Sequence, residues 1–169
     1  IAQRWNLVPQ SIKAYEQGKL SKPVKPICFY IDDAFPAEWK NAIKQGVELW
    51  NKAFEQAGYQ KAIEALDFPK NDRNFDADDI AYSCIRYVPS TSDKVSSSFL
   101  ANPQTGEIIN ASVFVPANVG NQIYRWLFLG SAASDVSMRT SHLPQDKFNQ
   151  GLKYLVAREV GRSLGLLDN

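Results

Sequence analysis

The last stretch of the chain, residues 151–169, has the periodicity of a helix with one buried face. Its apolar residues recur at steps of three and four, which places them along one side of an α-helix; they are Leu152, Leu155, Val156, Val160, Leu164 and Leu166. The chain has 169 residues, which fits one domain, and its 44% of hydrophobic residues can build a core around this helix.

Charge and hydropathy exclude two classes of partner. There are 19 basic and 18 acidic residues, which give a net charge of +1 and no basic surplus for nucleic acid or an anionic membrane. No uninterrupted apolar run is long enough to span a bilayer. The sequence starts at Ile1 without a visible signal peptide, so we expect a processed or excised piece of a protein.

The upstream sequence predicts strands alternating with helices. Residues 1–26 are polar and are expected to form a lead-in or linker segment, with the domain itself at 27–169. Short apolar or alternating runs predict strands, and a Ser-rich arm predicts one side of an edge hairpin, at 27–31, 59–66, 80–88, 91–101 and 107–115. Helical spacing, Pro at helix starts and Gly at helix ends predict helices at 9–17, 36–58, 116–130 and from Pro144 onward.

Cysteine, histidine and acidic residues leave few candidates for a metal or redox site. Cys28 and Cys84 lie on strand-like runs, where buried free thiols are expected and a bridge between them stays an alternative. The loop at 67–79 is rich in Asp and Asn but lacks calcium-loop spacing, so solvation is expected and calcium is the alternative. The single histidine, His142, lies with Met138 in a predicted surface loop.

The predicted final helix carries the sequence REVGRSLGLLDN. With Glu159 and Gly165 at its second and eighth positions, it resembles the zinc-binding signature H-E-x-x-H-x-x-G-x-x-H of metzincin peptidases. The resemblance implies that Glu159 stands where relatives have the general base and Gly165 where they have the turn glycine. The three positions that hold zinc-ligating histidines in relatives are occupied here by Arg158, Arg162 and Asp168.

These three replacements remove the chemistry of the metal site. A zinc ligand must offer a lone pair, and the guanidinium groups of Arg158 and Arg162 only donate hydrogen bonds. Asp168 alone, beside two fixed cations, is a poor site. Without the ion, Glu159 has no metal-activated water to deprotonate. No cofactor is therefore expected in this chain, although active relatives hold zinc.

The resemblance covers nearly the whole chain. Sequences around residues 4–7, 25–32, 45–58 and 102–111, with the final helix, are similar to large secreted metzincin-type peptidases of Bacteroidetes, whose helix reads HEVGHTLGLRHN. It implies an α+β fold of the zincin type. A twisted, mixed five-stranded sheet with an antiparallel edge strand would pack on long helices, including the motif helix. We expect this chain to lack the later subdomain with its methionine turn. The resemblance also implies a periplasmic, outer-surface or secreted location.

The combined interpretation is a pseudopeptidase or a peptide-binding or protein-binding module. We expect Asp168 to fold between Arg158 and Arg162 through charge-assisted hydrogen bonds. An extended peptide is expected to bind the edge strand by β-augmentation, near Ser96, Ser97, Ser98, Phe99 and Leu100, and a vestigial cleft stays an alternative. Two alternatives stay open: an active secreted zinc endopeptidase or a fragment of one, and a structural domain that contacts flanking domains of a larger secreted chain.

Overall fold

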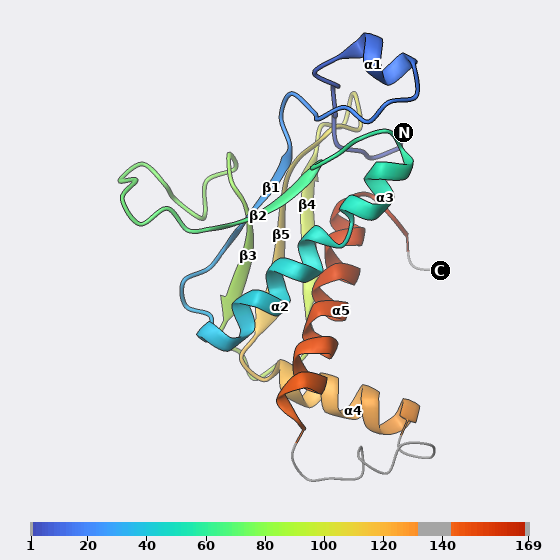
Figure 1. Cartoon of the computed structure of the whole chain (residues 1–169). Coiled ribbons are helices and arrows are strands. Elements are labelled where there is room, and N and C mark those ends of the chain that lie inside the picture. The colour runs from blue at the N-terminus through green and yellow to red at the C-terminus, as the bar shows by residue number, and fades with distance from the viewer. Residues whose placement is uncertain (1, 132–142, 168–169) are drawn as a thin grey trace.

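The computed structural model describes residues 2–131 and 143–167, and its strands form one mixed sheet (Figure 1). The order in the sheet is β2-β1-β3-β5-β4, in which β4 runs antiparallel to β5 and the other neighbours are parallel. The prediction of an α+β fold with a five-stranded mixed sheet and an antiparallel edge strand is confirmed. The strands are β1 (Ile27–Ile31), β2 (Ile63–Asp67), β3 (Ser83–Val88), β4 (Ser96–Ala101) and β5 (Ile108–Pro116).

Two helices pack side by side on one face of this sheet (Figure 1). They are α2 (Ala37–Glu48) and α5 (Gln145–Ser163), and they come close at Gly46, where a Cβ would lie 2.8 Å from the carbonyl oxygen of Lys153. A residue without a side chain is what allows this approach. The remaining helices are α1 (Ile12–Glu16), α3 (Asn51–Gln56) and α4 (Val119–Ser131).

The core lies between the sheet and these helices. Strand β1 shows how the sequence builds it, because Ile27, Phe29 and Ile31 are buried while Cys28 and Tyr30 between them are half-buried. Alternate side chains of a strand point to opposite faces, so the three buried residues face α2 and α5. The helix contributes the residues predicted from its periodicity, since Leu152, Leu155, Val156 and Val160 are all buried.

The opposite face of the sheet is covered in part by the loop at residues 68–82. Tyr30 of β1 lies 5.2 Å from Phe75 and 5.5 Å from Tyr82, measured between ring centroids, and Phe75 also contacts Phe68. Edge-on and tilted ring pairs of this kind are the favoured geometries of aromatic contacts. The aromatic residues of this polar loop thus shield β1 on its second face.

The predicted single helix over residues 36–58 is two helices, α2 and α3, which break at Leu49 and Trp50. Two side chains at the break make contacts outside the helix. The Trp50 indole donates to the carbonyl of Ala157 in α5 at 2.8 Å, and the Asn51 side chain bonds the backbone of Ile63 in β2. The apolar spacing continues across the break, so the sequence pattern alone did not reveal it.

Two strands begin later than predicted. Strand β2 starts at Ile63 rather than Tyr59, because Lys61 has a φ of +52°, which is incompatible with an extended strand. Strand β3 starts at Ser83 rather than Ile80, because a turn closes first: the Tyr82 N–H donates to the carbonyl of Asp79 at 3.1 Å. The predicted loop with Met138 and His142 lies outside the described residues.

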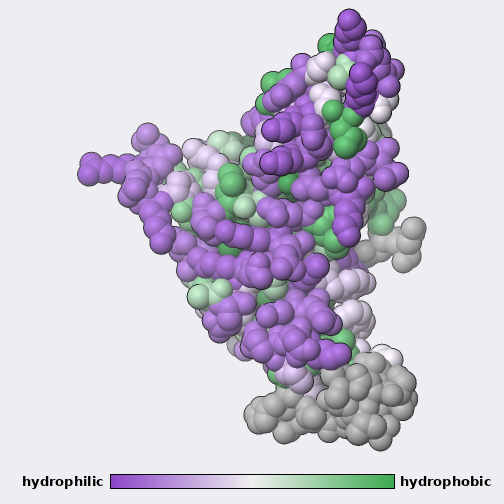
Figure 2. Space-filling view, in the orientation of Figure 1, coloured by the Kyte–Doolittle hydropathy of each residue, from purple (hydrophilic) through white to green (hydrophobic). Residues whose placement is uncertain are grey.

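The lead-in segment lies against the domain over the residues described. Arg4 forms a β-bridge with Glu107, and Trp5 and Leu7 pack against the core. Hydrophilic side chains dominate the face of the molecule shown in Figure 2, with hydrophobic ones in small groups between them. Within the described part of the chain, no helix has both the length and the apolar character to cross a membrane.

Candidate functional site

The carboxylate of Glu159 is the most deeply buried charged group at the predicted site. Glu159 is 1% exposed, on the side of α5 that faces the edge strand. Its Oε2 accepts a hydrogen bond from Ser97 Oγ at 2.8 Å, and Arg162 Nη1 donates to Oε1 at 3.1 Å and to Oε2 at 3.3 Å. Both carboxylate oxygens therefore have partners, and one partner is a cation.

Helix and strand geometry bring these three residues together. Glu159 and Arg162 are three positions apart on α5, which makes them neighbours on the helix surface. On β4, Ser97 and Phe99 are half-buried and alternate with the exposed Ser96, Ser98 and Leu100, which places Ser97 on the face toward α5. Glu159 and Ser97 were each predicted as site residues from the sequence, but their contact was not predicted.

The arginines at the other motif positions differ in their surroundings. Arg162 is half-buried and paired with Glu159, whereas Arg158 is exposed and lies with Tyr154 beside a surface hollow that Arg162 also borders. The pairing of Arg162 with Glu159 was not predicted. The expected position of Asp168 between the two arginines lies outside the described residues.

The residues described at this site do not fit a zinc ion. Arg158 and Arg162 have no lone pair to offer, and the carboxylate of Glu159 is already engaged by Ser97 and Arg162. Across residues 2–131 and 143–167, no group of three or more His, Cys, Asp or Glu side chains is placed to hold a metal ion.

Gly165 ends the motif helix with a left-handed turn, as its place in the motif predicts. Its φ is +92°, its N–H donates to the carbonyl of Arg162, and the next N–H, of Leu166, donates to Gly161. This pair of bonds is the Schellman arrangement, which satisfies carbonyls at a helix end. The expectation that Leu166 continues the buried face is wrong, because the turn carries it out of the helix and leaves it 51% exposed.

A groove runs between the edge strand and the end of the motif helix. We call it the β4 groove; it has a volume of about 440 Å³ and is lined by Ser97, Ser98, Phe99, Arg162, Leu166 and Leu167. Three of the five predicted peptide-binding residues thus line it. Leu100 instead borders a hollow that is also lined by residues of the 68–82 loop, and Ser96 lines neither.

The acidic loop uses its carboxylates locally. Asp72, Asp76 and Asp79 each accept the backbone N–H two residues further on, at 2.9 Å. Asp78 forms an ion pair with Arg86 of β3 at 2.6 Å. The three backbone contacts are those of Asx turns, which suit a polar surface loop.

Both cysteines are free, and we expect them to react slowly with Ellman's reagent at pH 8. Burial raises the pKa of the Cys84 thiol to about 11 and also raises the pKa of the Cys28 thiol. The thiolate is the reactive form, so only about 0.1% of Cys84 is reactive at pH 8. The rate for a Cys28→Ser variant should increase about tenfold per pH unit up to that pKa.

A Cys84→Ser variant, which keeps only the half-buried Cys28, should react faster than Cys28→Ser at the same pH. Titration of the unfolded wild-type protein without reductant should give two thiols. A count of zero would show that the two cysteines form a bridge, contrary to the structure.

Comparisons with protein-family models, with curated proteins and with solved structures find no match to this chain.

Proposed function

We propose that this chain is a metzincin-like module without peptide hydrolysis that binds an extended peptide or protein segment along the outer edge of β4. The observation that carries the proposal is the state of Glu159. A general base must reach the water whose proton it takes. Here the carboxylate at the general-base position is 1% exposed and bound by Ser97 and Arg162, and Arg162 occupies a ligand position of the motif.

The edge of the sheet supports the binding part of the proposal. Among the described residues, β4 pairs with β5 alone, so its other edge offers backbone groups to a further strand. An extended peptide adds to such an edge through main-chain hydrogen bonds, while its alternate side chains occupy neighbouring pockets. The β4 groove lies beside this edge, and its lining combines apolar Phe99 and Leu166 with polar Ser98 and Arg162.

The first test measures binding of an unfolded polypeptide, with fluorescein-labelled, heat-denatured casein as the probe. Fluorescence polarisation should report binding by the wild-type protein. Ser98→Trp should weaken it roughly tenfold or more, about 1.4 kcal/mol, because Ser98 is exposed in the lining of the β4 groove and the larger side chain would displace the peptide from it.

The matched control is Ser96→Trp, which places the same indole at an exposed position of the same strand outside the groove lining. It should bind casein with nearly wild-type affinity. If both variants lost affinity equally, the loss would come from placing an indole anywhere on β4 and not from the groove. If both bound casein as tightly as the wild type, a binding site at the β4 groove would be contradicted.

The second test concerns hydrolysis. The wild-type protein, incubated with labelled casein and added zinc, should release no fluorescent fragments beyond those of a no-protein control. Zinc-dependent cleavage that is abolished by Glu159→Gln would overturn the proposal in favour of an active peptidase. Cleavage that persists in Glu159→Gln would instead identify a contaminating protease, and a further purified preparation should then release none.

A further inference from the structure

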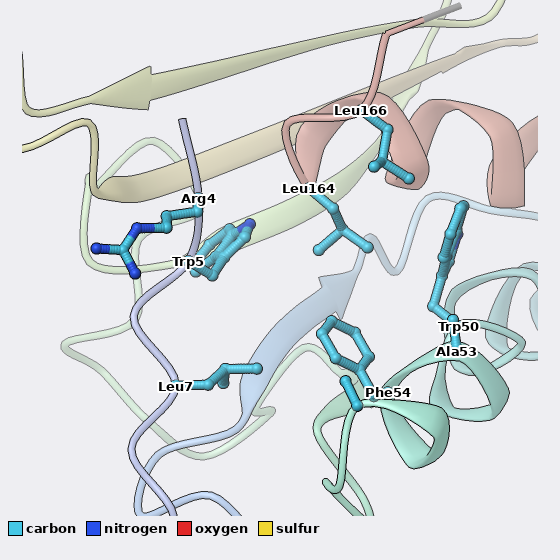
Figure 3. A pocket seen from close by; sticks show the side chains of 9 residues that line it. Arg4, Trp5, Leu7, Trp50, Ala53, Phe54, Leu164 and Leu166 are labelled. Atoms are coloured by element: carbon cyan, nitrogen blue, oxygen red, sulfur yellow. The ribbon is translucent and has the colours of Figure 1, made fainter. Parts of the chain in front are cut away.

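A second, apolar cavity lies at the end of the molecule where the N-terminal segment meets α3 and the end of α5. Figure 3 shows this N-terminal pocket, with the side chains of its walls drawn as sticks. It has a volume of about 360 Å³, within the usual range of small-molecule sites. Its walls are mainly Trp5, Leu7, Trp50, Phe54, Leu164 and Leu166.

The walls of the N-terminal pocket offer a ligand carbon surface rather than hydrogen bonds. Both indole N–H groups are already engaged: Trp5 Nε1 donates to the carbonyl of Ser163 at 3.0 Å, and Trp50 Nε1 donates to the carbonyl of Ala157 at 2.8 Å. The other main walls are aliphatic or phenyl side chains. A sugar or a nucleobase would leave its polar groups unpaired here, whereas an alkyl chain or a plain ring would not.

The pocket is preformed, because its walls are tied to one another across the fold. The two indole bonds fix the N-terminal segment and the start of α3 to α5. Tyr59 Oη donates to the carbonyl of Leu7 at 2.9 Å, and the Arg4 N–H donates to the carbonyl of Gly106 at 3.0 Å. A ligand would therefore meet walls that need little further ordering.

Arg4 supplies the one charged group of the lining. Its guanidinium extends away from the apolar side chains in Figure 3, at one side of the pocket. Within the described residues, no carboxylate forms an ion pair with Arg4. An arginine beside an apolar cavity complements a ligand that has an apolar body and one anionic end.

We infer that the N-terminal pocket binds a small amphiphilic carboxylate, with its hydrocarbon part between Trp5, Trp50 and Phe54 and its carboxylate at Arg4. This site is separate from the β4 groove, and the two share only Leu166 in their linings. The inference does not depend on peptide binding, because none of its ligand contacts involves β4.

Isothermal titration with decanoate and with 1-decanol tests the inference. The wild-type protein should bind both, and the intrinsic tryptophan fluorescence should change on binding because two indoles line the pocket. Arg4→Gln should weaken decanoate about fivefold, the effect of one exposed ion pair, and leave 1-decanol unchanged. Lys70→Gln, which removes an exposed cation from the 68–82 loop, should change neither affinity.

A pocket-filling variant tests the position of the hydrocarbon. Ala53 is exposed on α3 and lines the pocket, so Ala53→Phe should reduce the affinity for both ligands roughly tenfold or more while keeping the thermal midpoint of the wild type. Ser98→Trp should bind decanoate normally, which separates this site from the β4 groove. Wild-type affinity in Ala53→Phe, or no decanoate binding by the wild-type protein below roughly 1 mM, would overturn the inference.

Discussion

Replacing Gly165 by alanine is expected to lower the free energy of unfolding by about 3 kcal/mol. Two effects add at this position. The backbone has a φ of +92°, where an L side chain is strained, and the new Cβ would lie 2.3 Å from the carbonyl oxygen of Gln3. That oxygen belongs to the main chain of the N-terminal segment, so it cannot move aside by a side-chain rotation. Urea denaturation monitored by circular dichroism measures the loss.

Gly18→Ala is the matched control for the backbone effect alone. Gly18 also has a positive φ, of +72°, but no atom lies within 4 Å of the added Cβ. The free energy of unfolding of Gly18→Ala should fall by about 1 kcal/mol, because the backbone is strained but no steric clash is added. If the two variants were equally stable, the close approach of the N-terminal segment to the end of α5 would not exist in solution.

Replacing Arg162, the cation that pairs with Glu159, is expected to cause the second large loss of stability. Arg162→Leu should destabilise the protein by about 2 to 3 kcal/mol, because it leaves the carboxylate of Glu159 buried with Ser97 as its remaining partner in the cluster. This expected loss is smaller than that for a fully buried ion pair, because the Arg162 side chain is 32% exposed and solvent screens its charge.

A double-mutant cycle isolates the interaction. Glu159→Gln removes the charge, retains an acceptor for Ser97 and should lose about 1 kcal/mol. Adding Arg162→Leu to it should then cost about 1 kcal/mol or less, because the buried negative charge of Glu159 is already gone. Lys44→Leu breaks an exposed ion pair with Asp67 and should lose less than about 1 kcal/mol. Strict additivity in the cycle would contradict the Glu159–Arg162 pair.

Local patterns were enough to predict much of the fold. The apolar run at Ile27–Ile31 predicted a strand, and the turn-forming residues 102–106 predicted the turn of the edge hairpin, where Gly106 has a φ of +74°. The break between α2 and α3 was missed because side chains at this point bond across the fold. The indole of Trp50 bonds to α5 and the amide of Asn51 to β2, and neither partner is marked in the local sequence.

At the candidate site, too, local features were predicted from the sequence and contacts between distant residues were not. The buried face of the final helix and the turn at Gly165 follow from spacing within one segment, so the sequence could predict both. The hydrogen bond between Ser97 and Glu159 joins residues 62 positions apart. Strand alternation allowed Ser97 to face a helix, but it did not say which helix or which residue. The contact between Glu159 and Arg162, three residues apart on one helix, was not predicted, and the expected contact of Arg162 with Asp168 lies outside the described residues.

The hydrogen bond between the indole of Trp5 and the carbonyl of Ser163 spans 158 positions of the chain. Ribosomes release a polypeptide from its N-terminus onward, so Trp5 emerges long before its acceptor has been synthesised. Until then the indole of Trp5 lacks this acceptor, although the backbone of Arg4 and Leu7 can already bond to Gly106 and Tyr59. Completion of this end of the molecule is therefore a late event in biosynthesis, timed by the emergence of the final helix.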